Sequence, residues 1–212
     1  MSLLPQKSGL PVVLLVLLGA TAHADPSRIE QFLDATRTLN GQFSQVLTDA
    51  QGKVLSESEG TMAIKRPGRF RWHYTSPDEL LVLGDGKQIW SYDVALENAT
   101  VASQDKTLAG NPAALLAGDG TAADAFETVR TWHSGATEWV ELAPKQKQRD
   151  FRSVRLGFAG AALVAMELDD QLGQTTRIEF SSIEQNSPVE DALFVFIPPP
   201  GVDVIQAGGF NP

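Results

Sequence analysis

Residues Lys65–Tyr74 read Lys-Arg-Pro-Gly-Arg-Phe-Arg-Trp-His-Tyr, and this stretch indicates the fold more clearly than any other part of the chain. Side chains on a β-strand point alternately to its two faces. From Arg69 onwards, the three aromatic residues therefore share one face and the three basic residues share the other. Such a strand belongs to a sheet with one apolar face and one solvated face.

Similar short runs, separated by turn signals, occupy most of the remaining chain. About eleven strands are predicted, over residues 43–48, 54–66, 69–75, 80–83, 87–92, 126–133, 138–143, 151–158, 162–168, 175–183 and 194–197. Gly84-Asp85-Gly86 predicts a tight hairpin, because Asp-Gly tolerates the positive φ angles that such a turn requires. Short antiparallel strands in this number predict a mainly β fold built on a curved sheet or barrel.

Two segments break the strand pattern. Ser27 and Glu30 have the spacing of a capping box, and apolar residues then recur at helical intervals as far as Leu39, so a helix is expected until Asn40-Gly41. Residues 111–118 read Asn-Pro-Ala-Ala-Leu-Leu-Ala-Gly, with an N-cap residue first, proline at the first helical position and glycine after the end. This second helix carries no polar side chain in its interior, so it must cover an apolar surface.

Residues 1–24 are expected to be a cleaved secretory signal. They contain Lys7, an apolar run from Leu10 to Leu18 and the small-x-small triplet Ala22-His23-Ala24. The apolar run is too short to remain as a membrane-spanning helix. Removing 24 of the 212 residues leaves 188, and losing Lys7 changes the net charge from −9 to −10. We therefore expect residues 25–212 to form a single exported domain that is not embedded in a membrane.

The composition argues against several functional classes. The chain has no cysteine, which excludes disulfides, thiol catalysis, Cys-ligated zinc and the lipid-modified cysteine of a bacterial lipoprotein. Its negative charge argues against a nucleic-acid partner, even though basic and aromatic residues alternate over residues 69–74. His73 and His133 lie sixty residues apart, and Asp169-Asp170 runs into a turn. We therefore expect no catalytic residue, no metal site and no cofactor.

The sequence pattern allows two ways of completing the apolar core. The aromatic face of residues 69–75 can pack against an ordinary core, with its basic face solvated. The predicted strands, however, supply a large apolar surface with only short helices to fill it, so a hydrophobic ligand can also complete the core.

The sequence resembles the LolA family, whose members carry lipoproteins through the periplasm from the inner to the outer membrane of Gram-negative bacteria. The resemblance extends from the first helix to about Ile205, and rests on the joint order and spacing of segments 41–45, 65–72, 85–93, 168–175 and 194–205. It implies an unclosed antiparallel β-barrel of about eleven strands, with short helices forming a lid over a hydrophobic cavity for acyl chains.

The resemblance also implies roles for individual residues. Arg66 matches the arginine that holds the lid closed by donating hydrogen bonds to backbone carbonyls of the lid helices. A guanidinium suits this role because it offers five donors. The residues expected to line the cavity are Leu33, Phe43, Leu47, Met62, Phe70, Trp72, Leu83 and Trp90, and the expected lid helix comprises Pro112, Ala113, Ala114, Leu115 and Leu116.

The partners implied by the resemblance are acylated lipoproteins as cargo, an inner-membrane ABC transporter that loads the carrier, and an outer-membrane receptor. The carrier itself is expected to be a periplasmic monomer. That receptor shares the fold but is itself a lipoprotein, and the missing cysteine argues against it. A hydrolase lacks a credible nucleophile–base pair. A binding protein for small lipids or fatty acids remains the alternative, and whether the basic face at Arg69 and Arg71 docks a partner is also open.

Overall fold

The structure, a computed structural model, describes residues 27–104, 112–118, 126–145 and 151–207, although not the side chains of residues 112–114. The expected signal peptide, residues 1–24, and the expected N-cap Asn111 lie outside the described residues. Among the described residues, no helix has both the length and the apolar character needed to cross a membrane.

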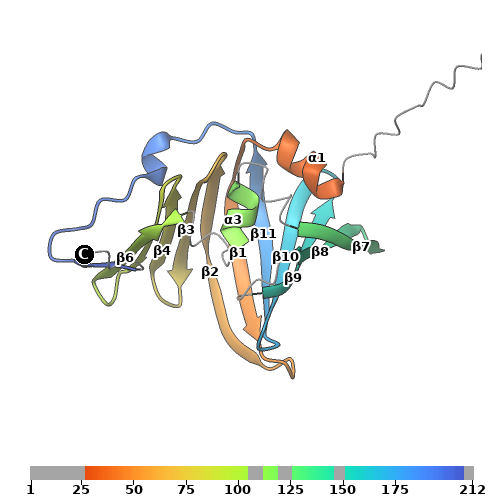
Figure 1. Cartoon of the computed structure of the whole chain (residues 1–212), viewed down its shortest axis with the longest axis horizontal. Helices are drawn as coiled ribbons and strands as arrows, with labels where there is room; N and C mark the ends of the chain where they lie inside the picture. The colour runs from red at the N-terminus through yellow and green to blue at the C-terminus, as the bar shows by residue number, and fades with distance from the viewer. Residues whose placement is uncertain (1–26, 105–111, 119–125, 146–150, 208–212) are drawn as a thin grey trace, which may run out of the picture.

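Twelve strands form one open sheet in the described part of the chain (Figure 1). They are β1 (Thr38–Thr48), β2 (Val54–Lys65), β3 (Arg69–Ser76), β4 (Leu80–Asp85), β5 (Gln88–Asp93), β6 (Asn98–Ser103), β7 (Phe126–Ser134), β8 (Thr137–Pro144), β9 (Phe151–Ala159), β10 (Ala162–Asp170), β11 (Thr175–Gln185) and β12 (Asp203–Gln206). The order across the sheet is β12-β6-β5-β4-β3-β2-β1-β11-β10-β9-β8-β7, so β7 and β12 stand at opposite ends. The predicted mainly β, unclosed antiparallel sheet is confirmed, with one parallel pair, β12–β6.

The two faces of this sheet have different roles. We call the face that carries Phe70 and Trp72 the inner face, and the face that carries Arg69 and Arg71 the outer face. Two helices, α1 (Arg28–Ala35) and α3 (Pro112–Ala117), contribute side chains to the buried cluster on the inner face. In Figure 1, α3 lies in front of the central strands and α1 lies at their upper end.

The first helix begins as expected but ends earlier. Ser27 and Glu30 form the predicted capping box. The helix stops at Ala35, and the chain enters β1 at Thr38, so the expected end at Asn40-Gly41 is wrong. Gly41 lies inside β1 at a β-bulge opposite β11, where a Cβ atom would come within 2.9 Å of the Ser181 carbonyl oxygen. The glycine therefore allows a close approach of two strands rather than ending a helix.

The C-terminal part of the chain also differs from the expectation. Residues 194–197 do not form the predicted strand; a 3₁₀ helix, η2 (Asp191–Phe194), leads into an extended segment, and only β12 pairs with the sheet. Strands β6 and β12 were not predicted. We call residues 187–207 the C-terminal strap. Phe196 of the strap packs against Trp90, with ring centroids 5.2 Å apart, so aromatic packing on the outer face replaces strand pairing.

Candidate functional site

The inner face of the central strands is a continuous aromatic surface. Phe43 lies 5.2 Å from Trp72 and 5.0 Å from Tyr74, measured between ring centroids, and Trp72 lies 6.2 Å from Phe180. Strand register produces this arrangement, because residues paired across neighbouring strands point to the same face. Phe70 in the same cluster is completely buried. Burial also raises the pKa of the Tyr74 phenol, so the phenol stays neutral at physiological pH.

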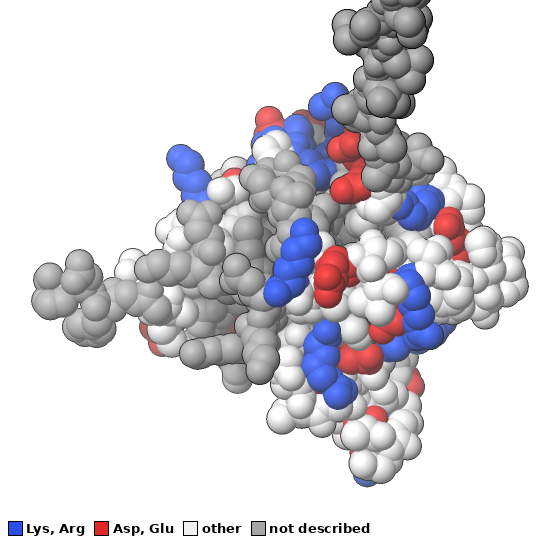
Figure 2. Space-filling view, turned by 45° about the vertical axis from the view of Figure 1, so that its right-hand side comes forward, with Lys and Arg blue, Asp and Glu red and all other residues white. Residues whose placement is uncertain are grey.

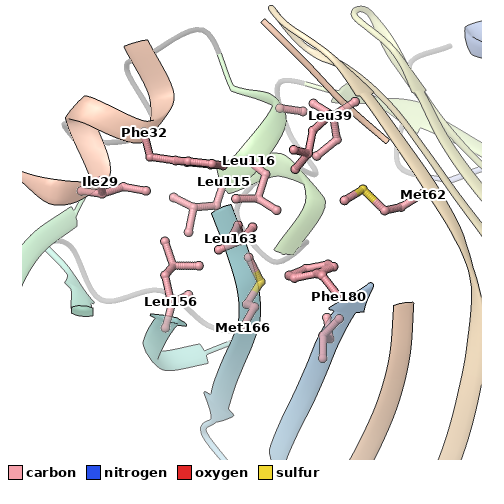
Figure 3. Close-up of a cluster of buried hydrophobic side chains, with 14 of the residues drawn as sticks. Ile29, Phe32, Leu39, Met62, Leu115, Leu116, Leu156, Leu163, Met166 and Phe180 are labelled. Atoms are coloured by element: carbon pink, nitrogen blue, oxygen red, sulfur yellow. The ribbon is translucent and has the colours of Figure 1, made fainter. Parts of the chain in front are cut away.

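The two helices cover this surface with apolar side chains. Figure 3 shows the side chains of Ile29 and Phe32 from α1 and of Leu115 and Leu116 from α3 pointing into the buried cluster. Burying a leucine side chain stabilises a structure by roughly 1.5–3 kcal/mol, and a helix of six residues is not stable alone in water. Apolar contact with the sheet therefore accounts for the position of α3.

Arg66 connects the two helices where their C-terminal ends approach β2 and β3. Its Nε donates to the carbonyl of Gly118, which follows α3, at 2.8 Å. Its Nη1 donates to the carbonyl of Leu33 and, at 3.4 Å, to that of Thr36, at the end of α1. Helix C-termini carry partial negative charge and unpaired carbonyls, so a partly buried guanidinium stabilises both ends together.

Hydrogen bonds attach both helices to the rest of the protein. At the start of α1, Arg28 donates to Glu138 at 3.2 Å and to the Gly160 carbonyl at 2.6 Å. At its end, the Asn186 side chain donates to the Ala35 carbonyl at 2.8 Å. For α3, the described polar links to the sheet are the Arg66 bond and a 2.6 Å bond from the Gly68 N–H to the Ala117 carbonyl. Among the described residues, polar contacts hold both ends of α1, and the polar contacts found for α3 lie at its C-terminal end.

Comparison with known proteins identifies the family. Residues 34–197 match the family model described as outer membrane lipoprotein carrier protein LolA. The chain belongs to the LolA family. An outer-membrane lipoprotein carrier protein of Dechloromonas aromatica is 42% identical over 190 residues, covering 89% of this chain and 91% of the relative. One of Nitrosospira multiformis is 39% identical over 193 residues, with coverage of 90% and 93%.

Solved structures agree with this at the level of the fold. An uncharacterized conserved protein from Thermus thermophilus has a TM-score of 0.52 at 12% identity and covers 85% of this chain and 95% of its own. A DUF1329 family protein from Desulfovibrio piger has a TM-score of 0.50 at 14% identity, with coverage of 79% and 93%. The open sheet of this LolA-family chain is therefore similar to folds already solved.

Most of the expected cavity residues lie together in this LolA-family structure. One buried cluster contains five of them, together with both lid leucines: Leu33, Phe43, Met62, Phe70, Trp72, Leu115 and Leu116. Leu47 lies further along β1 on the inner face and is partly exposed. Pro112, Ala113 and Ala114 form the first part of α3, and their side chains are outside the described set.

Two expected cavity residues lie on the wrong face. Leu83 pairs with Arg71 on one side and with Trp90 on the other, so Leu83 and Trp90 belong to the outer face. Both faces of β4 and β5 carry apolar residues, because the C-terminal strap covers the outer one through Phe194 and Phe196. The prediction that Leu83 and Trp90 line the cavity is therefore wrong.

The C-terminal half contributes buried residues that were not predicted from the sequence. In addition to those named, the cluster includes Leu156, Leu163, Met166, Ile178 and Phe180 from β9, β10 and β11. The alternating pattern over residues 162–168 and 175–183 was the available signal, because it predicts one buried face on each strand. Their pairing with β1 across the sheet could not be derived from local patterns.

His73 and Asp170, two of the titratable residues considered in the sequence, make hydrogen bonds at the surface and in a turn. His73 Nε2 lies 2.9 Å from Glu79 Oε1 on an exposed part of the surface. The Asp170 carboxylate accepts bonds from the backbone N–H groups of Leu172 and Gln174, both at 2.8 Å, and so orders a hairpin turn. Among the described residues, no group of three or more His, Cys, Asp or Glu side chains could hold a metal ion.

Proposed function

We propose that this chain carries lipoproteins between two membranes, shielding their acyl chains on the inner face of its open sheet and delivering them to an acceptor. The observation that carries the proposal is the buried aromatic surface under α1 and α3, with Arg66 bonded to the ends of both helices. Membership of the LolA family supports it, because the relatives are named outer-membrane lipoprotein carrier proteins.

The energetics of acyl chains explain why a carrier needs this architecture. Moving a fatty chain into water costs roughly 0.8 kcal/mol per CH₂, so a lipoprotein with several chains does not cross an aqueous compartment unaided. A hydrogen bond of the lid is worth only about 1 kcal/mol net. Acyl chains can therefore take the place of the lid side chains on the inner face, and removal of the cargo lets the lid return.

Within this proposal the described residues have separate tasks. Arg66 is the latch, because it joins the C-terminal ends of α1 and α3. Five residues would contact acyl chains: Leu33, Phe43, Met62, Phe70 and Trp72. Leu47 lies at the exposed margin of the same face, and Leu83 and Trp90 are left out because they lie on the outer face.

The proposal also includes compartment and partners. Residues 1–24 would direct export to the periplasm, where residues 25–212 would act as a monomeric, single-domain carrier. An inner-membrane ABC transporter would load it, and an outer-membrane receptor would accept the cargo. The chain would work without catalysis and without a cofactor. A small-lipid binding protein is the less favoured function, because the full-length relatives are named as lipoprotein carriers.

The test is to identify what the protein carries. The tagged chain is purified from the periplasm under native conditions, and the bound molecules are identified by mass spectrometry. Phe70→Glu should lose the cargo, because it puts an unpartnered carboxylate on the buried inner face. Gln88→Glu is the matched control, since it adds the same charge at an exposed position on the outer face. Acylated lipoproteins support the proposal, whereas phospholipid or fatty acid alone would establish the small-lipid binder.

A further inference from the structure

Two basic residues of the outer face, Lys65 of β2 and Arg69 of β3, contact the chain's own C-terminal strap. The Asp191 carboxylate lies 2.5 Å from Lys65 Nζ and 2.8 Å from Arg69 Nη1. The Arg69 guanidinium also lies over the ring of Phe194, 5.8 Å from its centroid. Arg71 differs from Lys65 and Arg69, because no described residue forms a hydrogen bond or ion pair with its half-buried side chain.

Arg71 faces a hollow of about 380 Å³ on the outer face. The bulge between β1 and β11 lies at this hollow, since Gly41 and Ser182 both line it. Polar side chains and one leucine form most of its lining, and none of them is acidic: Asn40, Gln42, Thr61, Arg71, Ser182 and Leu193. Burial lowers the pKa of the Arg71 guanidinium, consistent with a cation that has lost water without gaining a carboxylate.

The other arginines of the outer face have carboxylate partners. Arg130 is 2.5 Å from Glu141, Arg155 is 2.8 Å from Glu167, and Glu167 also lies 2.6 Å from Arg177. Figure 2 shows such basic and acidic side chains interspersed over one face of the molecule. Desolvating a charge is costly unless it is paired. An incoming carboxylate would give Arg71 an ion pair like those that Arg130, Arg155 and Arg177 already form on this sheet.

An exposed apolar strip begins at the edge of the same hollow. Phe194 is buried at the end of η2, and Phe196 packs against Trp90 and Tyr92 of the sheet, so Val195 and Ile197, which alternate with them along the extended segment, face away from the protein. Leu193, Val195 and Ile197 are 42%, 60% and 80% exposed. Leu193 belongs to both features, because it also lines the Arg71 hollow. Contiguous exposed apolar residues of this kind mark protein–protein contact sites.

We propose that the Arg71 hollow and the strip Leu193–Val195–Ile197 form one docking surface for a protein partner, which inserts an Asp or Glu side chain flanked by apolar residues. The carboxylate pairs with Arg71, and its apolar neighbours cover the strip. The surface lies on the outer face, whereas the lid helices cover the inner face. A partner bound here leaves the lid free to open, so the carrier can be held at a membrane while cargo passes. This surface does not depend on the nature of the cargo.

The first test measures whether the hollow binds a carboxylate with an apolar tail. Sodium butyrate is titrated into the full chain while NMR follows the Arg71 Nε–Hε signal and the Leu193 methyl signals. Neutral butyramide and sodium chloride are the matched probes. We expect saturable shifts with butyrate and with neither of the other two probes. Arg71→Gln should bind butyrate about tenfold more weakly, since a charge-assisted bond is lost. Equal shifts with butyramide, or a non-saturating shift at Arg71 like that at exposed Arg37, would overturn the site.

The second test concerns the partner. Arg71→Glu and Val195→Lys are compared with Arg37→Glu, which makes the same charge change at an exposed residue outside the surface. Cargo transfer from inner-membrane vesicles is measured against carrier concentration, and cargo retention by the loaded carrier is measured separately. We expect both surface variants to need several times more carrier, with retention unchanged. Transfer indistinguishable from that of Arg37→Glu would refute the docking role, and lost retention would show that the surface acts through the inner face. A carrier that loads no lipoprotein at all would instead count against the proposed function.

Discussion

Replacing Arg66 by leucine gives the most direct test of the latch. The substitution removes the donors that reach the carbonyls of Leu33, Thr36 and Gly118. Of these three bonds, the one to Gly118, at 2.8 Å, attaches the end of α3. A partly buried, charge-assisted bond is worth about 1.5 kcal/mol, which corresponds to roughly a tenfold increase in the fraction of time that α3 is detached. The two bonds to α1 add to the loss of global stability, which we expect to reach about 2 to 3 kcal/mol in total.

One backbone amide reports the detachment of α3. The Gly68 N–H donates to the Ala117 carbonyl at 2.6 Å, so it exchanges with solvent when α3 leaves the sheet. Native-state hydrogen exchange should therefore show about tenfold less protection of Gly68 in Arg66→Leu. Protection of Ile178, in the β10–β11 ladder, should fall only in line with the loss of global stability, because buried central strands exchange through global unfolding. Urea unfolding followed by circular dichroism gives the global loss.

Arg66→Lys is the matched control. Lysine keeps the charge but lacks the planar fork that reaches both helices, so we expect an intermediate loss of Gly68 protection. If Gly68 in Arg66→Leu keeps its wild-type protection while urea stability falls, Arg66 stabilises the fold without fastening α3. The latch assignment would then be wrong, and the Gly68–Ala117 bond together with leucine packing would be the attachment of α3.

Three further predictions concern the inner face, the lid and the strap. Gly84→Ala should lower the free energy of unfolding by about 1–3 kcal/mol in urea titration, because a Cβ there would lie 2.3 Å from the Phe70 ring; an unchanged midpoint would show that the ring moves without cost. Leu116→Ala should increase fluorescence of a dye that binds apolar surface, because α3 loses a buried side chain; dye binding equal to that of wild type would contradict this role of the leucine. The Asp191 pKa is lowered, first by its hydrogen bond with Lys65, so its stabilising effect is present above the unfolded-state pKa and is lost as pH falls through the folded-state value. The difference in Tm between wild type and Asp191→Asn should accordingly be present at pH 6 and shrink as the pH falls below the ordinary aspartate pKa of about 3.9; a difference that stays constant over the whole acid range in which the protein remains folded would exclude ionisation of Asp191 as its cause.

Local patterns were sufficient where one face of a strand is apolar and the other polar. The aromatic alternation at Phe70, Trp72 and Tyr74 predicted the inner face of β3, and the structure has these residues in or against the buried cluster. The capping box at Ser27 likewise marked the start of α1. In both cases the signal is contained within a few residues, and nothing distant in the sequence alters it.

Prediction failed where distant parts of the chain decide the outcome. Leu83 and Trp90 match an inner-face pattern, yet they pack under a strap that is about a hundred residues away in sequence, since Phe196 lies 5.2 Å from Trp90. The strap itself reads as a strand because Phe194–Ile197 is apolar throughout, but its backbone turns at η2 and does not pair there. The unpaired Arg71 was equally hidden, because pairing depends on which carboxylates the sheet register brings close.

The central position of β1 has a consequence for how the molecule is made. One of its neighbours, β2, follows directly in sequence, but the other is β11, so that Phe43 pairs with Phe180. Contacts between residues so far apart form slowly, because a long loop must close before they stabilise anything. A chain that reaches its compartment N-terminus first cannot complete the inner face until β11 is present. The binding surface therefore forms only once nearly the whole chain is available for folding, and a product truncated before β11 would lack it.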